Sequence, residues 1–192
     1  MELEGKRLNE ISVSREPCAM AMSGNGETLV VANELPAGRS DRGSVAASVS
    51  LIDTDSHHVE DVALPNGSGG LRGVCLDPDG QFAYVTHILA RYRLPTMQLE
   101  RGWMNTNAVS VIDVQAKQLV NTVLLDEIDS GAANPWGIAC TSDAAMLCIA
   151  HAGTQEVSVI DRQDLHRKLA DVQQGKAVTA VSDAAEHVPN DL

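Results

Sequence analysis

The chain has 192 residues, a length that suits one ordinary domain with a buried core. Hydrophobic residues make up 44% and charged residues 21%, which argues against wholesale disorder; aromatic residues reach only 3%, so the core must be aliphatic. The net charge of -12 argues against nucleic acid as a partner, since phosphate binding needs clustered Lys and Arg, and no apolar run reaches the ~20 residues of a membrane-spanning helix.

The chain begins with residues 3–13, which resemble the last strand of a unit whose first three strands are missing. A 17-residue segment then occurs three times, as Pro17–Asn33, Leu71–His87 and Pro135–His151. Each copy has two short apolar runs around a turn, with Asn-Gly, Asp-Gly and Asp-Ala as the respective turn residues. Because Asn and Gly tolerate the positive φ of tight turns, each copy predicts a β-hairpin of two strands, a and b.

A second, five-residue motif follows each copy. It is VSLID at 49–53 and VSVID at 109–113 and 157–161, and it predicts a third strand, c. A polar turn and a fourth strand, d, follow in the first two units. In the third unit, residues 164–172 instead predict a short helix, with Leu165, Leu169 and Val172 on one face.

Repeated four-stranded units predict an all-β fold, a β-propeller of four-stranded antiparallel blades. About three blades are present, with a short C-terminal helix, in one partial domain over residues 1–192. Its expected parts are strand d of a preceding blade at 3–13, blades at 17–64 and 71–125, an incomplete blade at 135–162, and a helical or polar tail at 163–192. Since a closed propeller needs four to eight blades, we expect the remaining blades in the same chain or in an oligomer.

The connection between strands b and c varies most. The distance from the end of strand b to the last residue of strand c is 20 residues in the first unit (33 to 53), 26 in the second (87 to 113) and 10 in the third (151 to 161). The surplus, 34–47 and 88–106, is expected to form irregular loops on the face where the d–a connections also emerge. A protein, small-molecule or glycan ligand is expected on this face.

The candidate ligand-binding residues belong to two groups. Strand b ends in Asn33, His87 and His151 at equivalent positions, where two histidines could bind a metal or shuttle protons, or could instead hydrogen-bond within their own blades. The second insertion contains an aromatic and cationic cluster that could recognise a carboxylate, a glycan or a protein, or could pack over its own propeller. Its binding candidates are Arg91, Arg93, Arg101 and Trp103.

The sequence pattern of the repeats resembles the YVTN family of propeller repeats. The matching residues are Pro135–Ala139 (PWGIA), Asp77–Gly80 (DPDG), Tyr84–His87 (YVTH) and Val157–Asp161 (VSVID), and the resemblance covers roughly residues 3–162. It implies a bacterial surface-layer, secreted or periplasmic binding platform, and hence a periplasmic or extracellular location. We therefore expect a non-catalytic binding scaffold.

A subset of such propellers is fused to c-type cytochrome modules resembling di-haem peroxidases, and the long insertions are similar to that subset. The alternative function is thus the propeller domain of a c-type cytochrome oxidoreductase. None of the four cysteines, Cys18, Cys75, Cys140 and Cys148, forms the Cys-x-x-Cys-His of a haem c site. No cofactor is expected in this chain, and haem c would belong to a missing part. The cysteines lie in apolar stretches, where small buried side chains are expected and a disulfide is the alternative.

Overall fold

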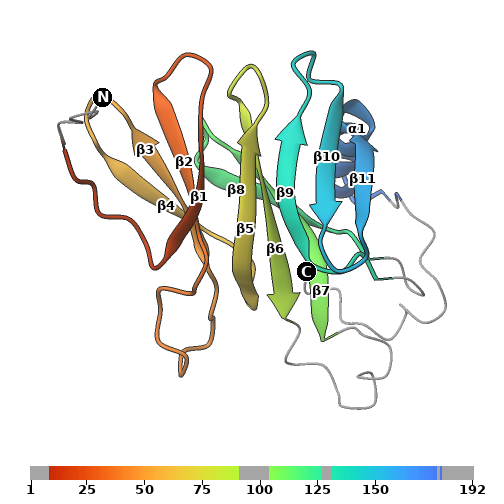
Figure 1. The fold of residues 1–192 in the computed structure, drawn as a ribbon, viewed down its shortest axis with the longest axis horizontal. Helices are drawn as coiled ribbons and strands as arrows, with labels where there is room; N and C mark the ends of the chain where they lie inside the picture. The colour runs from red at the N-terminus through yellow and green to blue at the C-terminus, as the bar shows by residue number, and fades with distance from the viewer. Residues whose placement is uncertain (1–8, 91–103, 127–130, 177, 179–192) are drawn as a thin grey trace, which may run out of the picture.

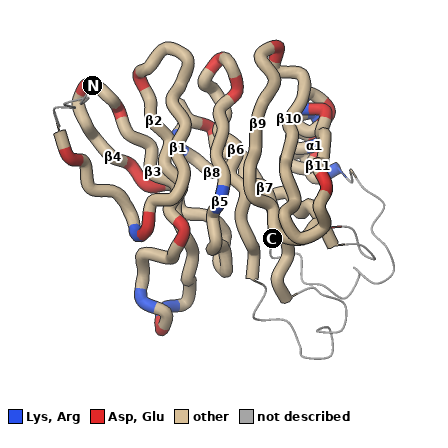
Figure 2. Tube along the Cα trace, viewed as in Figure 1, with Lys and Arg blue, Asp and Glu red and all other residues tan. Residues whose placement is uncertain are grey.

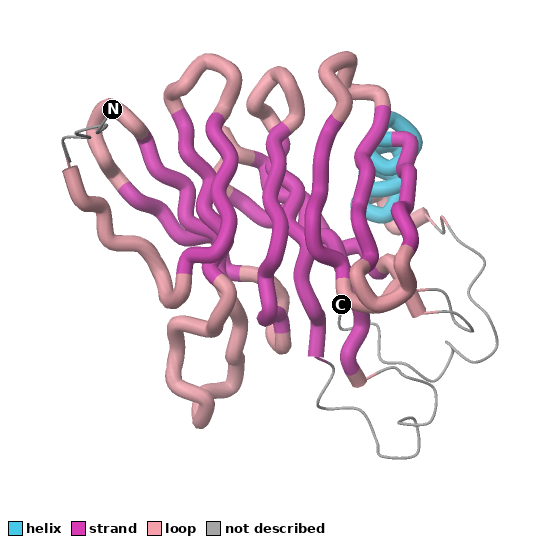
Figure 3. The backbone as a smooth tube through the Cα atoms, viewed as in Figure 1, coloured by secondary structure: helices cyan, strands magenta, loops and turns pink. Residues whose placement is uncertain are grey.

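The computed structural model describes residues 9–90, 104–126, 131–176 and 178, which form three antiparallel sheets and one helix (Figure 1). The sheets stand side by side like blades, with strands β1, β5 and β9 along one common side (Figure 3). Blade 1 consists of β1 (Pro17–Met22), β2 (Thr28–Asn33), β3 (Ser48–Asp53) and β4 (Val59–Ala63). Blade 2 consists of β5 (Ser68–Leu76), β6 (Phe82–Ala90), β7 (Asn105–Asp113) and β8 (Gln118–Leu124). Blade 3 consists of β9 (Pro135–Cys140), β10 (Met146–His151) and β11 (Glu156–Asp161).

Within each blade, strands that are consecutive in sequence are neighbours in the sheet. The predicted all-β fold of four-stranded antiparallel units is therefore confirmed, as a partial propeller with sheets of 4, 4 and 3 strands. The three a–b turns share one geometry. Gly26, Gly80 and Ala144 occupy the same repeat position with φ of 77°, 69° and 58°.

Two apolar cores fill the spaces between the blades. Aliphatic side chains of blade 1, among them Val49 and Leu51, pack against Val85 and Ile112 of blade 2. The second core, between blades 2 and 3, includes Tyr84, which is fully buried. Each core is thus shared by two sheets, so that a blade is stabilised by its neighbours rather than by itself.

Helix α1 (Arg162–Gln173) begins directly after β11, and the predicted helix at 164–172 is confirmed. The Asp161 side chain caps it by accepting a hydrogen bond from the backbone N–H of Asp164. Leu165 and Leu169 are buried in the core between blades 2 and 3. The helix therefore follows strand c of blade 3 where a fourth strand follows in the other two blades.

Three details differ from the sequence-based expectations. Residues 9–13, the described part of the predicted strand at 3–13, are irregular and form no strand; the side chains of Asn9 and of the following Ser14 bond His57 and Asp61 of blade 1. The second insertion is not irregular throughout, because residues 88–90 pair with 105–107 and lengthen the β6–β7 hairpin. All four cysteines are free, and none of them is fully buried; Cys18 is exposed, because strand β1 faces the open side of the molecule.

No helix in the described part of the chain is long and apolar enough to cross a membrane.

Candidate functional site

The b–c and d–a connections emerge along one edge of the three blades, the lower edge in Figure 1. We call this edge the loop face and define it by residues 34–47, 64–67, 131–134 and 152–155. The a–b and c–d turns lie along the opposite edge. The expectation that the two kinds of long connection share a face is thereby met for the described residues.

Hydrogen bonds join the first b–c connection to the d–a connection beside it. The backbone N–H of Ala47 donates to the carbonyl of Ser68 at 2.8 Å, and that of Gly67 donates to the carbonyl of Val45 at 2.8 Å. The N–H of Val45 donates to the side-chain oxygen of Asn66 at 2.8 Å. Two segments about 20 residues apart in sequence thus form one framework. Its tip, residues 37–44, is exposed and contains the Arg39–Asp41 ion pair (Figure 2).

The next d–a connection is fixed by Asp126 and Asn107. The Asp126 carboxylate accepts bonds from the backbone N–H of Asn107 at 2.6 Å, from its side-chain amide at 2.8 Å, and from the N–H of Ala132 at 2.7 Å. The Asn107 side-chain oxygen accepts from the N–H of Asn134 at 2.9 Å. The two d–a connections are therefore each anchored by a polar side chain, Asn66 in the first and Asp126 in the second. Such anchored connections hold a binding surface in place on a rigid scaffold.

The predicted cluster of Arg91, Arg93, Arg101 and Trp103 lies outside the described residues. Strand β6 ends and strand β7 begins at the loop face (Figure 1). The assignment of these residues to ligand binding stays a prediction.

His87 is fully buried and bonded within its own blade. Its Nε2 lies 2.8 Å from the hydroxyl of Ser110, which in turn lies 2.7 Å from the hydroxyl of Thr122. Its Nδ1 lies 3.2 Å from the carbonyl of Ile88 and must be the donor, because a carbonyl only accepts. Burial lowers the pKa of His87 to about 4, so the ring is neutral at pH 7.

Asn33 and His151 make the equivalent contact in their own blades. The Asn33 amide donates to the Ser50 hydroxyl at 2.9 Å, and His151 Nε2 lies 2.8 Å from the Ser158 hydroxyl. Ser50 and Ser158 stand at the same repeat position as Ser110. All three strand-b residues therefore bond the serine at the second position of the strand-c motif in their own blade. This is the alternative in which these side chains hydrogen-bond within their own blades. Among the described residues, Asn33 Oδ1 and His151 Nδ1 are buried without a hydrogen-bond partner.

Residues 9–90, 104–126, 131–176 and 178 contain no group of three or more His, Cys, Asp or Glu side chains that could hold a metal ion.

Sequence reasoning missed a polar cluster at the junction of blades 2 and 3. Arg162, the first residue of α1, forms an ion pair with Asp77 and donates from Nε to the Tyr84 hydroxyl at 2.7 Å. The same hydroxyl lies 2.7 Å from His166 Nε2. Burial raises the pKa of Tyr84, so the hydroxyl stays protonated. The cluster joins the helix to blade 2, and only the fold brings its members together.

Sequence reasoning also missed a group on the inner strands. Cys18, Arg72 and Trp136 are each the second residue of the 17-residue segment, and they stand on β1, β5 and β9. The guanidinium carbon of Arg72 lies 4.5 Å from the centre of the Trp136 ring, and its Nη2 lies 3.1 Å from a carboxylate oxygen of Glu34. We call Cys18, Glu34, Arg72 and Trp136 the axial group. The signal for it was present in the sequence, because three unlike residues share one repeat position.

The backbone enters each inner strand in the same way. Two positions before the shared site, Glu16, Gly70 and Asn134 all adopt the left-handed conformation, with φ of 61°, 60° and 61°. This common geometry places the three side chains at one level of the propeller.

The fold and the repeated blades define a partial β-propeller-like protein. In sequence, the chain is similar to hydrazine synthase subunit beta of Kuenenia stuttgartiensis, with 31% identity over 145 residues. The matched region is 76% of this chain and 36% of that protein, so the chain spans about a third of the length of this relative.

Two solved structures resemble the fold. One chain of Kuenenia stuttgartiensis hydrazine synthase matches with a TM-score of 0.70 and 28% identity, covering 80% of this chain and 42% of that one. A functionally unknown protein from Desulfotomaculum acetoxidans matches with a TM-score of 0.53 and 15% identity, covering 80% and 39%; that likeness concerns the fold alone. No family model matches the chain, so the resemblance to YVTN repeats stays a prediction.

Proposed function

We propose that this chain is a non-catalytic propeller segment that binds a protein partner through its loop face, as one component of a multi-subunit enzyme. The observation that supports it most directly is the selective lengthening of one edge. Blades 1 and 2 have extended b–c connections on the loop face, while the turns on the opposite edge remain short.

The similarity to a subunit of hydrazine synthase supports the choice of a protein as the partner. The exposed tip at 37–44 rests on backbone bonds to the neighbouring connection, so binding would order few additional residues. Preorganised surfaces lose less conformational entropy on association than flexible ones do.

The experiment replaces each long loop separately in the full-length protein. In one variant a Gly-Asn-Gly link replaces residues 37–44, and in the other an Asn-Gly turn replaces residues 91–103. Native gel filtration of tagged protein purified from its own cells is the measurement. We expect the unaltered protein to elute in a larger assembly, and at least one loop variant to elute alone with its circular dichroism spectrum unchanged.

The matched control alters the opposite edge. Glu27→Lys and Asp79→Lys change exposed residues of the a–b turns, and the assembly should survive both. Retention of the assembly by both loop variants, or its loss in the control, would contradict binding through the loop face.

We further propose that another blade of the same repeat covers the outer face of blade 3. The support comes from strand c, because the first and third residues of its VSLID or VSVID motif face the following blade. The first position is 0% exposed in Val49 and in Val109, but 63% exposed in Val157. The third position is 4% exposed in Leu51, 0% in Val111 and 64% in Val159. Identical or similar apolar side chains are thus buried in two blades and exposed in the third.

A charge placed on this face tests the covering blade. In the full-length protein, Val159→Asp should lower the free energy of unfolding by more than about 2 kcal/mol, because an unpaired carboxylate would be buried. Urea unfolding measures it. A change within about 0.5 kcal/mol, as expected at a solvent-exposed site, would refute a covered face.

A second candidate function is the propeller domain of a c-type cytochrome oxidoreductase with its haem module elsewhere. It is favoured by the fact that the similar protein is a subunit of an enzyme. Haem staining of the full-length protein and of its co-purified partners tests this candidate, and haem-free partners would exclude it. A periplasmic or extracellular location belongs to both proposals, and cell fractionation checks it.

A further inference from the structure

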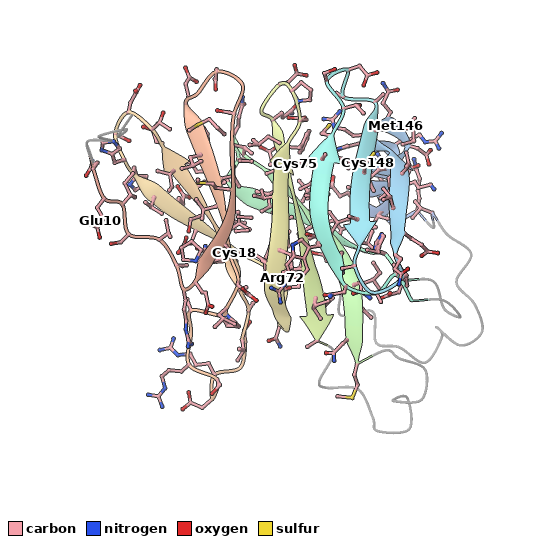
Figure 4. The ribbon with its side chains drawn as sticks, in the orientation of Figure 1. Glu10, Cys18, Arg72, Cys75, Met146 and Cys148 are labelled. Atoms are coloured by element: carbon pink, nitrogen blue, oxygen red, sulfur yellow. The ribbon has the colours of Figure 1, made fainter. Side chains whose placement is uncertain are left out.

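The axial group combines residues from all three blades at one level. Cys18 comes from blade 1, Arg72 from blade 2 and Trp136 from blade 3, while Glu34 follows the last residue of β2. Figure 4 shows Cys18 and Arg72 on the neighbouring inner strands β1 and β5. The strand-c motif keeps the same residue types from blade to blade. The second residue of the 17-residue segment instead carries a thiol, a guanidinium and an indole in the three blades.

Arg72 is held in place on two sides. One face of its guanidinium lies over the Trp136 ring, and Nη2 is paired with Glu34. The Arg72 side chain nevertheless remains 34% exposed, and Trp136 is 47% exposed. Within the described part of the chain, the guanidinium makes no other hydrogen bond. Since a guanidinium has five N–H donors in a fixed fork, Arg72 retains donors for a further acceptor.

This arrangement suits a carboxylate, a planar group with a single negative charge. A flat fork of N–H donors matches the two oxygens of a carboxylate, and such charge-assisted bonds are stronger than neutral ones. Stacking on Trp136 fixes the guanidinium before a ligand arrives, so little side-chain entropy would be lost. The exposed part of the indole offers an apolar surface beside the fork.

We propose that the axial group binds a small organic acid, whose carboxylate is held by Arg72 and whose short apolar chain lies against Trp136. Glu34 weakens this binding, because its carboxylate already occupies one edge of the guanidinium and repels a second negative charge. Cys18 contributes a neutral thiol that donates to the Leu71 carbonyl at 3.0 Å and forms part of the wall. The axial group shares only Glu34 with the loop face, and the proposal does not depend on protein binding there.

The test uses the full-length protein labelled with 5-fluorotryptophan. Trp136→Phe assigns the fluorine resonance of Trp136, and the protein is titrated with butanoate and with butanamide, its uncharged counterpart. We expect a saturable shift of the Trp136 resonance with a Kd on the order of millimolar for butanoate. Butanamide should bind at least tenfold more weakly.

Two substitutions should act in opposite directions. Arg72→Gln should weaken butanoate binding at least tenfold, whereas Glu34→Gln should strengthen it several-fold. Arg72→Lys keeps the charge but loses the stacked fork, and an intermediate affinity is expected. Arg167→Gln, at an exposed position of helix α1, is the matched control and should leave the affinity unchanged. An unchanged circular dichroism spectrum shows whether each variant remains folded.

Equal shifts with butanoate and butanamide, or no shift with either, would overturn the proposal. Unchanged affinity in folded Arg72→Gln or Arg72→Lys protein would overturn it as well. If Glu34→Gln failed to strengthen binding, the guanidinium edge would not be the binding point, and the axial group would only join the blades.

Discussion

The a–b turn of blade 3 offers a substitution that should stabilise the protein. Gly26, Gly80 and Ala144 occupy one repeat position, all with positive φ, and Ala144 alone has a side chain there. The three turns share the same backbone bond. In each, the N–H of this residue donates to the carbonyl oxygen three residues earlier, at 2.9 Å for Gly26 and Ala144 and 3.0 Å for Gly80. We predict that Ala144→Gly raises the free energy of unfolding.

The magnitude follows from two opposing effects. The left-handed conformation costs a residue with a Cβ atom roughly 1–2 kcal/mol. Glycine also increases the conformational entropy of the unfolded chain, which offsets about 0.4–1 kcal/mol of that gain. The net stabilisation is therefore about 0.5–1 kcal/mol, and the expected rise in Tm is about 1–4 °C for a protein of this size.

Urea unfolding followed by circular dichroism measures the change, and Gly26→Ala is the matched reverse substitution. An added Cβ at Gly26 meets no atom within 4 Å, so its cost reports backbone conformation rather than a clash. We expect Gly26→Ala to lower stability by a similar amount. If Ala144→Gly lowered stability while Gly26→Ala had no effect, the argument from backbone conformation would be refuted.

Three further predictions concern buried contacts. The pKa of His87 is about 4 in the folded state, below its unfolded value of 6.5. The free energy of unfolding therefore keeps its full value above pH 6.5 and falls by about 3 kcal/mol as the pH drops toward 4. His87→Asn should remove this loss in thermal melts at acid pH. Gly73→Ala should destabilise strongly, because its Cβ would lie 2.3 Å from the carbonyl oxygen of Trp136, and urea unfolding would show it; a loss below about 0.5 kcal/mol would contradict this close approach. Tyr84→Phe should cost about 1–3 kcal/mol, since it removes the acceptor of a half-buried Arg162 bond, and an unchanged Tm would show that the bond is dispensable.

The strands and their order could be predicted from sequence because repetition multiplies a weak signal. A single run such as Val157–Asp161 does not distinguish a strand from a buried helical turn. Three copies, each preceded by the same 17-residue hairpin segment, do, and the structure pairs β10 with β11 accordingly. The helix was predictable from spacing instead, because Leu165 and Leu169 lie on one helical face and both are buried.

The functional groups were less accessible, because their members meet only across blades. Arg72 contacts Glu34 and Trp136 at sequence separations of 38 and 64 residues, and no local pattern encodes either distance. For the histidines, the structure shows the within-blade bonds that were one of the two alternatives. His87 and His151 stood out as reactive residue types, yet each one bonds a serine of its own blade.

The repeat also explains why function should be sought at the inner strands. In strand c, equivalent residues are alike because each must fill the same space between two blades, as Val49 and Val109 do at 0% exposure. The second residue of strand a does not fill the space between two blades, since it faces the common inner side of the blades. Packing therefore does not dictate Cys18, Arg72 or Trp136, and their chemical difference requires another cause. A ligand that contacts three blades at once, and needs a different group from each, would supply that cause.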